Sequence, residues 1–98
     1  MPRRQTRLIA GHTYHVFNRG NDRREIFDRP YGYADFVRLL RTYLVDAGDL
    51  IVCYCLMPNH FHLMLRPFND HASRRLGRLQ MAYSKAHQRR TGRIGSLY

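Results

Sequence analysis

The stretch from Met57 to Leu65 carries the residues of this chain that are best placed to do chemistry. It holds two histidines, His60 and His62, separated by Phe61. Successive side chains of a β-strand point to opposite faces, so histidines at this spacing leave the same face and can converge on one metal ion. Two imidazoles do not complete the shell of a divalent ion, so a third ligand or water must join them. The spacing alone also fits two polar residues on the solvent side of a half-buried strand.

The apolar pattern around these histidines predicts a β-hairpin. Residues Leu50 to Met57 form a continuous apolar run of strand length, and His60 to Arg66 alternates between two faces. Pro58 lies between the two runs and suits the first corner of a tight turn. An earlier strand is predicted over about His12–Asn18, and the turn-forming residues 19–22 follow it.

Two amphipathic helices are predicted from the spacing of apolar residues. The first runs from Tyr33 to Leu44, and Gly48 suits a left-handed position at its end. The second begins after a cap at Asn69 or Asp70. Its inner stripe consists of Leu76, Leu79, Tyr83 and Ala86.

The segment Ile94–Tyr98 has the pattern of the beginning of a fourth strand. The element order is then β-α-β-β-α-β, the order of ferredoxin-like folds. The sequence thus predicts an α+β fold in which both helices cover one face of an antiparallel sheet, while the histidines lie on the open face. A chain of 98 residues without repeats or linkers is expected to form one domain, residues 1–98.

Basic residues greatly outnumber acidic ones. The chain has 17 Lys+Arg against 7 Asp+Glu, a formal net charge of +10, and sixteen of the seventeen bases are arginine. Residues 50–98 carry eight bases and a single acid, Asp70. The arginine fork suits bidentate contacts to phosphate, so this surplus predicts nucleic acid as the partner. Solubility alone is the other interpretation of such a charge.

Other features of the sequence exclude some classes of protein. No apolar run approaches the roughly 18–20 residues that span a membrane, and no N-terminal segment resembles a signal peptide. Cys53 and Cys55 are too few for a disulfide scaffold, and we expect them to pack as small hydrophobes in the hairpin. These features favour a cytoplasmic protein without a membrane partner.

Further candidate contacts to DNA lie outside the histidine pair. Tyr14 and Phe17 offer surfaces on which unpaired bases can stack, although one of the two must lie in the core. His15 could share the open surface with His60, whereas His87 is expected to be a solvent-exposed residue or a helix cap. Solvated surface groups are the plainer interpretation of each. The candidate arginines are Arg3 and Arg4 in the N-terminal arm, Arg19, Arg23 and Arg24 near the first turn, and Arg78, Arg89 and Arg90 in the second helix.

Five blocks, spread over almost the whole chain, carry a resemblance to a known family. They are Tyr14-His15-Val16-Phe17-Asn18-Arg19-Gly20, Ile26-Phe27, Tyr54-Cys55-Leu56-Met57-Pro58-Asn59-His60-Phe61-His62-Leu63-Met64-Leu65, Tyr83-Ser84-Lys85 and Arg89-Arg90-Thr91-Gly92-Arg93-Ile94-Gly95. The chain resembles the single-tyrosine HUH transposases of the insertion-sequence type, and most closely the REP-associated tyrosine transposases. The long central block is highly specific and the others are moderately so. The pair that matches His60 and His62 is the HUH motif of that family.

The resemblance implies a sequence-specific single-strand DNA endonuclease of DNA transposition and recombination. In such an enzyme the residues matching His60 and His62 hold Mg²⁺ or Mn²⁺, which polarises the scissile phosphate as a Lewis acid. A tyrosine hydroxyl attacks phosphorus, and a 5′-phosphotyrosine linkage and a free 3′-OH result. The implied partner is single-stranded or hairpin DNA. The insertion-sequence relatives work as homodimers, whereas REP-associated relatives can be monomeric, so the resemblance leaves both a homodimer and a monomer open.

The chain departs from the family pattern at its C-terminal end. In the family, the nucleophilic tyrosine and the usual third metal ligand lie on a helix after the fourth strand, whereas this sequence ends at Tyr98. We therefore expect the domain to be C-terminally truncated, the catalytic tyrosine to lie beyond Tyr98 and this chain alone to be unable to cleave. Gln88 stands where relatives commonly have Asn. Tyr83 lies on the apolar stripe of the second helix and is predicted to be a core residue.

Two functions from other classes remain open at this point. A non-catalytic DNA-binding module, or a domesticated transposase fragment, would bind DNA without need of a metal. A ferredoxin-like RNA-binding domain would place stacking aromatic residues on its two central strands. The predicted central strand carries His60 and His62 instead, so the RNA-binding hypothesis ranks last.

Overall fold

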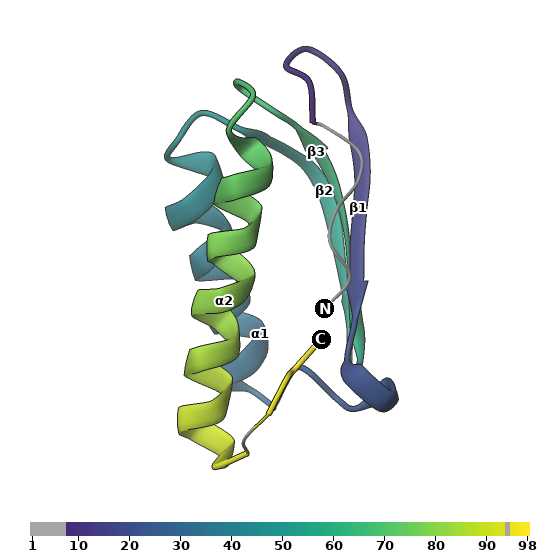
Figure 1. The fold of residues 1–98 in the computed structure, drawn as a ribbon, viewed down its shortest axis with the longest axis vertical. Helices are drawn as coiled ribbons and strands as arrows, with labels where there is room; N and C mark the ends of the chain where they lie inside the picture. Colours follow the sequence, from purple (N-terminus) through teal and green to yellow (C-terminus); the bar gives the residue numbers. More distant parts are fainter. Residues whose placement is uncertain (1–7, 94) are drawn as a thin grey trace.

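The described backbone contains one antiparallel sheet of three strands. The computed structural model describes residues 8–93 and 95–98, and its strands are β1 (Tyr14–Arg19), β2 (Leu50–Met57) and β3 (His60–Arg66). The order across the sheet is β1-β3-β2, and β3 pairs antiparallel with both neighbours. β1 and β2 therefore run parallel to each other, with the strand that carries the two histidines between them (Figure 1). The predicted hairpin is confirmed.

Two helices pack against one face of this sheet (Figure 1). A short 3₁₀ turn, η1 (Asn21–Arg23), follows β1. The helix α1 (Tyr31–Leu40) continues into a π-helical turn, η2 (Arg41–Val45), and α2 (Ala72–Thr91) has 20 residues. α2 ends at Gly92, whose φ of 73° is a left-handed conformation that glycine adopts easily. In the part of the chain that the structure describes, no helix has both the length and the apolar character needed to cross a membrane.

The core lies between the helices and the inner face of β3. Phe61, Leu63 and Leu65 alternate along the strand, and each is at most 1% exposed. Burying one such side chain contributes about 1.5–3 kcal/mol, so the alternation determines which face of β3 turns inward. The residues of α2 that form the opposing stripe are buried as predicted: Leu76, Leu79, Tyr83 and Ala86.

The fourth strand expected over Ile94–Tyr98 is not formed in residues 95–98, and Ile94 lies outside the described residues. Leu97 is nevertheless part of the core, at 2% exposure. Its carbonyl oxygen accepts a hydrogen bond of 2.8 Å from the backbone N–H of Asn21. The segment thus contacts the turn after β1 without adding a strand to the sheet.

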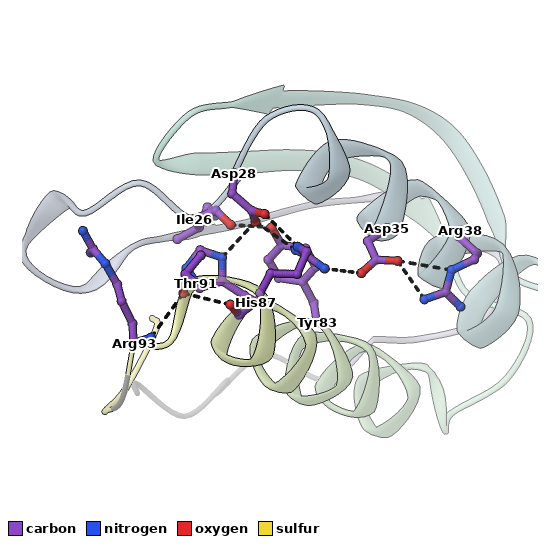
Figure 2. Close-up of polar contacts among 9 residues, drawn as sticks. Ile26, Asp28, Asp35, Arg38, Tyr83, His87, Thr91 and Arg93 are labelled. Carbon is purple, nitrogen blue, oxygen red and sulfur yellow. Dashed lines mark hydrogen bonds and ion pairs between the residues drawn. The ribbon is translucent and has the colours of Figure 1, made fainter.

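A network of ion pairs joins the end of α2 to α1 and to the loop before it (Figure 2). Arg90 donates two hydrogen bonds to the Asp28 carboxylate, at 2.7 and 2.9 Å, and another to Asp35. The pKa of Asp28 falls to about 2, chiefly because of the hydrogen bonds from Arg90. His87 donates from Nδ1 to Asp28 at 3.2 Å and is 3% exposed, so the expectation of an exposed His87 is wrong.

We predict that Asp28→Asn lowers the free energy of unfolding by about 1–3 kcal/mol at neutral pH, because Arg90 loses one of its two carboxylate partners. The pKa of Asp28 is lower in the folded chain than its ordinary value of 3.8. Its contribution is therefore complete above about pH 4 and is lost as the pH falls toward 2. Urea denaturation followed by circular dichroism should show the difference between variant and wild type shrinking over that range.

Asp46→Asn is the matched control, since Asp46 is exposed. It should change the free energy of unfolding by less than about 0.5 kcal/mol. Equal losses for the two variants, or a difference from wild type that stays constant down to about pH 2.5, would contradict the role of Asp28.

Candidate functional site

The face of the sheet away from the helices, called here the open face, carries three histidines. His60 and His62 leave β3 on the side opposite Phe61, as the sequence predicts, and both are half-buried. His15 of β1 pairs in register with Met64 and therefore shares that face. The ring centroids of His60 and His62 are 5.0 Å apart, and so are those of His62 and His15. The structure thus brings the predicted pair together and adds a third imidazole beside it.

The neighbouring strand β2 presents both cysteines to the same face. Cys55 is in register with His62, and Cys53 with Met64, and both cysteines are exposed. The expectation that they pack as small hydrophobes is wrong, because β2 is an edge strand and these positions point away from the helices. None of the three strands carries a carboxylate. The open face therefore offers imidazole and sulfur groups but no acidic oxygen.

His60 is held by the turn that precedes it. Its Nδ1 donates to the side-chain oxygen of Asn59 at 2.7 Å. The amide nitrogen of Asn59 in turn donates to the carbonyl oxygen of Arg23 at 3.5 Å, which sets the direction of the amide group. Because Nδ1 carries the proton in this arrangement, Nε2 of His60 keeps its lone pair for a ligand.

His62 is held by His15. The Nδ1 atom of His62 and the Nε2 atom of His15 are 2.8 Å apart, and the two rings stack with 16° between their planes. Partial burial lowers the pKa of His62, and the neighbouring imidazoles of His15 and His60 lower it further, because positive charges so close together repel one another. His62 is therefore neutral at physiological pH, the form in which imidazole binds a metal. In the tautomer in which Nδ1 of His62 donates to Nε2 of His15, Nε2 of His62 keeps its lone pair for a ligand.

These residues fit a divalent ion that accepts imidazole nitrogen. Nδ1 of His60 donates the outer hydrogen bond that ligating histidines usually make, and Nδ1 of His62 does so in the tautomer that donates to His15. Across residues 8–93 and 95–98, no three His, Cys, Asp or Glu side chains are grouped so that they could hold a metal ion. A phosphate oxygen, water or another group must therefore complete the shell. An imidazole pair suits a transition-metal ion better than Mg²⁺.

Two of the candidate arginines, Arg19 and Arg23, lie near the histidine pair in the fold, although they are distant from it in sequence. Arg19 is exposed on the open face, in register with His60. Arg23 ends the 3₁₀ turn η1 and is exposed, whereas Arg24, the next residue, is half-buried and donates to the carbonyl oxygen of Ser96 at 3.1 Å. Asn59 contacts both the Arg23 carbonyl oxygen and the His60 ring, so this turn is connected directly to the histidine site.

The structure places the other candidate arginines elsewhere. Arg78 and Arg89 are exposed on α2, in the helical layer, whereas the histidines lie on the other side of the sheet. Arg90 is bound by the two carboxylates of the network in Figure 2 and is not available to a phosphate, so we remove it from the candidate DNA contacts. Arg3 and Arg4 lie outside the described residues.

Asn59 is the residue of this site that sequence reasoning missed. It lies in the turn between the two strands of the hairpin, and its bond to His60 gives it a positioning role. Its place directly before the histidine pair is the signal that could have indicated this. The partnership of His15 with His62 has no local signal, because it depends on the pairing of strands 47 residues apart.

Comparison of the chain with protein-family models, with curated proteins and with solved structures finds no match. A function must therefore be argued from the residues of the chain itself. They provide two imidazoles aimed from one face of a sheet, a third imidazole that holds one of them, and a neighbouring cluster of arginines.

We expect long-range ¹H–¹⁵N spectra above about pH 8 to show His60 as the Nδ1–H tautomer, because Asn59 accepts at that nitrogen. Asn59→Ala removes the acceptor, so the Nε2–H tautomer of His60 should become populated. The signals of His12, which is exposed before β1, should not change and serve as the control. An unchanged His60 tautomer in the variant would show that Asn59 does not hold this ring.

Proposed function

We propose that this chain is a DNA-binding domain of the HUH transposase type, which binds single-stranded or hairpin DNA together with a divalent metal ion. One observation carries the proposal: His60 and His62 leave the central strand on one face, and each has its Nδ1 atom engaged. In the HUH motif, the two histidines that match this pair hold the metal ion. The formal net charge of +10 supports nucleic acid as the partner.

The order of strands supports the same proposal. β1, α1 and β2 form a β-α-β unit whose two parallel strands are separated by β3. This split unit is a part of the ferredoxin-like arrangement, which adds a fourth strand beside β1. Leu97 already contacts the turn after β1 through its carbonyl oxygen. We therefore propose the β-α-β-β-α-β order for the domain, with its last strand beginning near this contact.

The residues of the open face have separate parts in the proposed activity. A divalent ion on His60 and His62 would supply Lewis-acid activation of a phosphate when it is bound. Arg19, in register with His60, is placed to donate to the oxygens of the same or the next phosphate. Arg23 lies along the turn from that point and can follow the backbone of the strand, whereas the guanidinium of Arg24 donates to the carbonyl oxygen of Ser96. The absence of carboxylates from the three strands avoids repulsion of the phosphates.

We assign no nucleophile to the tyrosines near the C-terminal end of the described chain. Tyr83 is 0% exposed, so its prediction as a core residue is confirmed, and burial raises its pKa. Tyr98 is partly buried, and burial raises its pKa as well. Because the pKa of each tyrosine is raised, neither hydroxyl ionises readily, as a nucleophile at the histidine site would have to do. We propose that cleavage, where it occurs, uses a tyrosine beyond Tyr98 as in the family that the chain resembles.

A non-catalytic DNA-binding module is the second candidate function. It is favoured by one observation: the described residues include no group of three side chains that could hold a metal ion. Such a module would bind DNA through its arginines alone. Its affinity would fall with salt but would not respond to a chelator.

We predict that Mn²⁺ binds the complex of the chain with hairpin DNA, and that His60→Ala or His62→Ala weakens this binding at least about tenfold, because each removes one imidazole ligand. Isothermal titration calorimetry provides the measurement. His12→Ala, the removal of an exposed histidine outside the site, is the control and should bind as the wild type does. Equal affinity of wild type and His60→Ala for Mn²⁺ would refute the metal site.

The chelator response separates the two candidate functions. If the histidines hold a metal that contacts phosphate, EDTA should weaken the binding of a hairpin with a single-stranded flank, and added Mn²⁺ should restore it. The same experiment on the double variant His60→Ala with His62→Ala should show no response. Chelator-insensitive binding by the wild-type chain would favour the non-catalytic module.

A further inference from the structure

Phe17 is a large aromatic side chain that the fold leaves in solvent beside the histidines. It is 63% exposed, whereas its neighbour Val16, which points into the core, is 1% exposed. Phe17 lies in register with His62 and shares the open face with it. A single exposed apolar residue is ordinary on a protein surface, so the argument for a role depends on what surrounds this ring.

Two imidazoles hold the ring of Phe17 in place. Its centroid is 5.2 Å from that of His15, with 35° between the planes, and 6.0 Å from that of His62, with 32° between them. The two histidines are themselves joined by a hydrogen bond of 2.8 Å. The ring is thus braced on one side and exposed on the rest of its surface. A group that is already ordered loses little conformational entropy when a ligand binds to it.

The surroundings of Phe17 favour a ligand that combines a flat apolar group with negative charge. Arg19 lies two residues farther along the same face, and no strand of the sheet carries a carboxylate. A nucleotide has both parts, a base that stacks on aromatic rings and a phosphate that pairs with arginine. An apolar protein surface would instead bury Arg19 and the imidazoles without partners, at a cost in free energy.

The sequence left open whether Tyr14 or Phe17 provides the exposed ring of β1. Tyr14 packs against the hydrophobic core, and its hydroxyl accepts a hydrogen bond of 3.0 Å from the backbone N–H of Ile9. The ring of Tyr14 therefore faces the core and is not the exposed ring of β1. On the other flank of His62, the residue in register is Cys55, which has no ring. Phe17 thus provides the stacking surface next to His62, on its β1 side.

We propose that Phe17 is a stacking platform for an unpaired nucleobase of single-stranded DNA, placed so that the neighbouring phosphate of that strand lies at His60 and His62. This proposal rests on the function proposed above. It adds a contact to a DNA base, whereas the metal contacts the phosphate. Any of the four bases can stack on an aromatic ring. Phe17 therefore contributes affinity and sets the register of the strand at the histidines, and it does not read the sequence.

The test uses the whole chain and a DNA hairpin with a single-stranded flank that carries 2-aminopurine at one position after another. In the wild type, the fluorescence of one flank position should fall on binding because that base stacks on Phe17. Phe17→Ala should abolish this change and weaken binding of the flanked hairpin by about 5- to 100-fold, the range expected for one stacked base. Phe17→Trp should retain both the quenching and the affinity.

Phe68→Ala is the matched control, because Phe68 is also 63% exposed but lies beside Gly48, away from the histidines. It should leave the affinity and the 2-aminopurine response at their wild-type values. A second arm of the experiment removes the DNA base instead of the ring of Phe17. An abasic site at the responsive position should weaken binding to the wild type by a similar factor and should have little further effect on Phe17→Ala.

The outcomes distinguish this inference from the proposed function. If Phe17→Ala binds the flanked hairpin as tightly as Phe68→Ala does, while Mn²⁺ still binds through His60 and His62, the stacking platform is refuted and the proposed function stands. If the wild-type chain binds the flanked hairpin no more tightly than a blunt one and no Mn²⁺ binds, both are refuted.

Discussion

The alternation of side chains along β3 is the constraint on which the rest of this structure depends. Phe61, Leu63 and Leu65 are buried under the helices, and both edges of the strand are paired. A slip of one residue would bring all three apolar side chains into solvent and turn the polar ones inward. His60 and His62 are therefore held on the open face by the packing of the core. The orientation of the candidate site follows from the same burial that stabilises the fold.

Charge is divided between the two layers of the molecule. In the helical layer, carboxylates engage arginines: Asp28 and Asp35 bind Arg90, and the buried Asp49 binds Arg75 at 2.6 Å. The strands of the sheet carry no carboxylate. The positive charge near the histidines is therefore not neutralised by the sheet itself, whereas part of the charge of α2 is used to hold the fold together. The role of an arginine in this chain depends on which layer it occupies.

Local periodicity was sufficient to predict the hairpin, both helices and the common face of His60 and His62, because alternation and helical spacing are properties of neighbouring residues. The positions of Cys53 and His87 could not be predicted in the same way. The exposure of Cys53 depends on which strand forms the edge of the sheet. The burial of His87 and the engagement of Arg90 depend on a carboxylate some 60 residues away in sequence, 59 from His87 and 62 from Arg90. Such pairings arise only when the helices pack together.

The central claim is that the open face of β3 binds a divalent ion through two imidazoles. Paramagnetic broadening by substoichiometric Mn²⁺, recorded on amide signals of the ¹⁵N-labelled chain with hairpin DNA, tests it most directly. The account predicts that broadening is strongest at His60 and His62, extends across the strands to Phe17, and is weak at Arg78 on the far helical layer. Broadening centred on acidic residues away from the sheet, such as Asp46, or spread evenly over the chain, would contradict it.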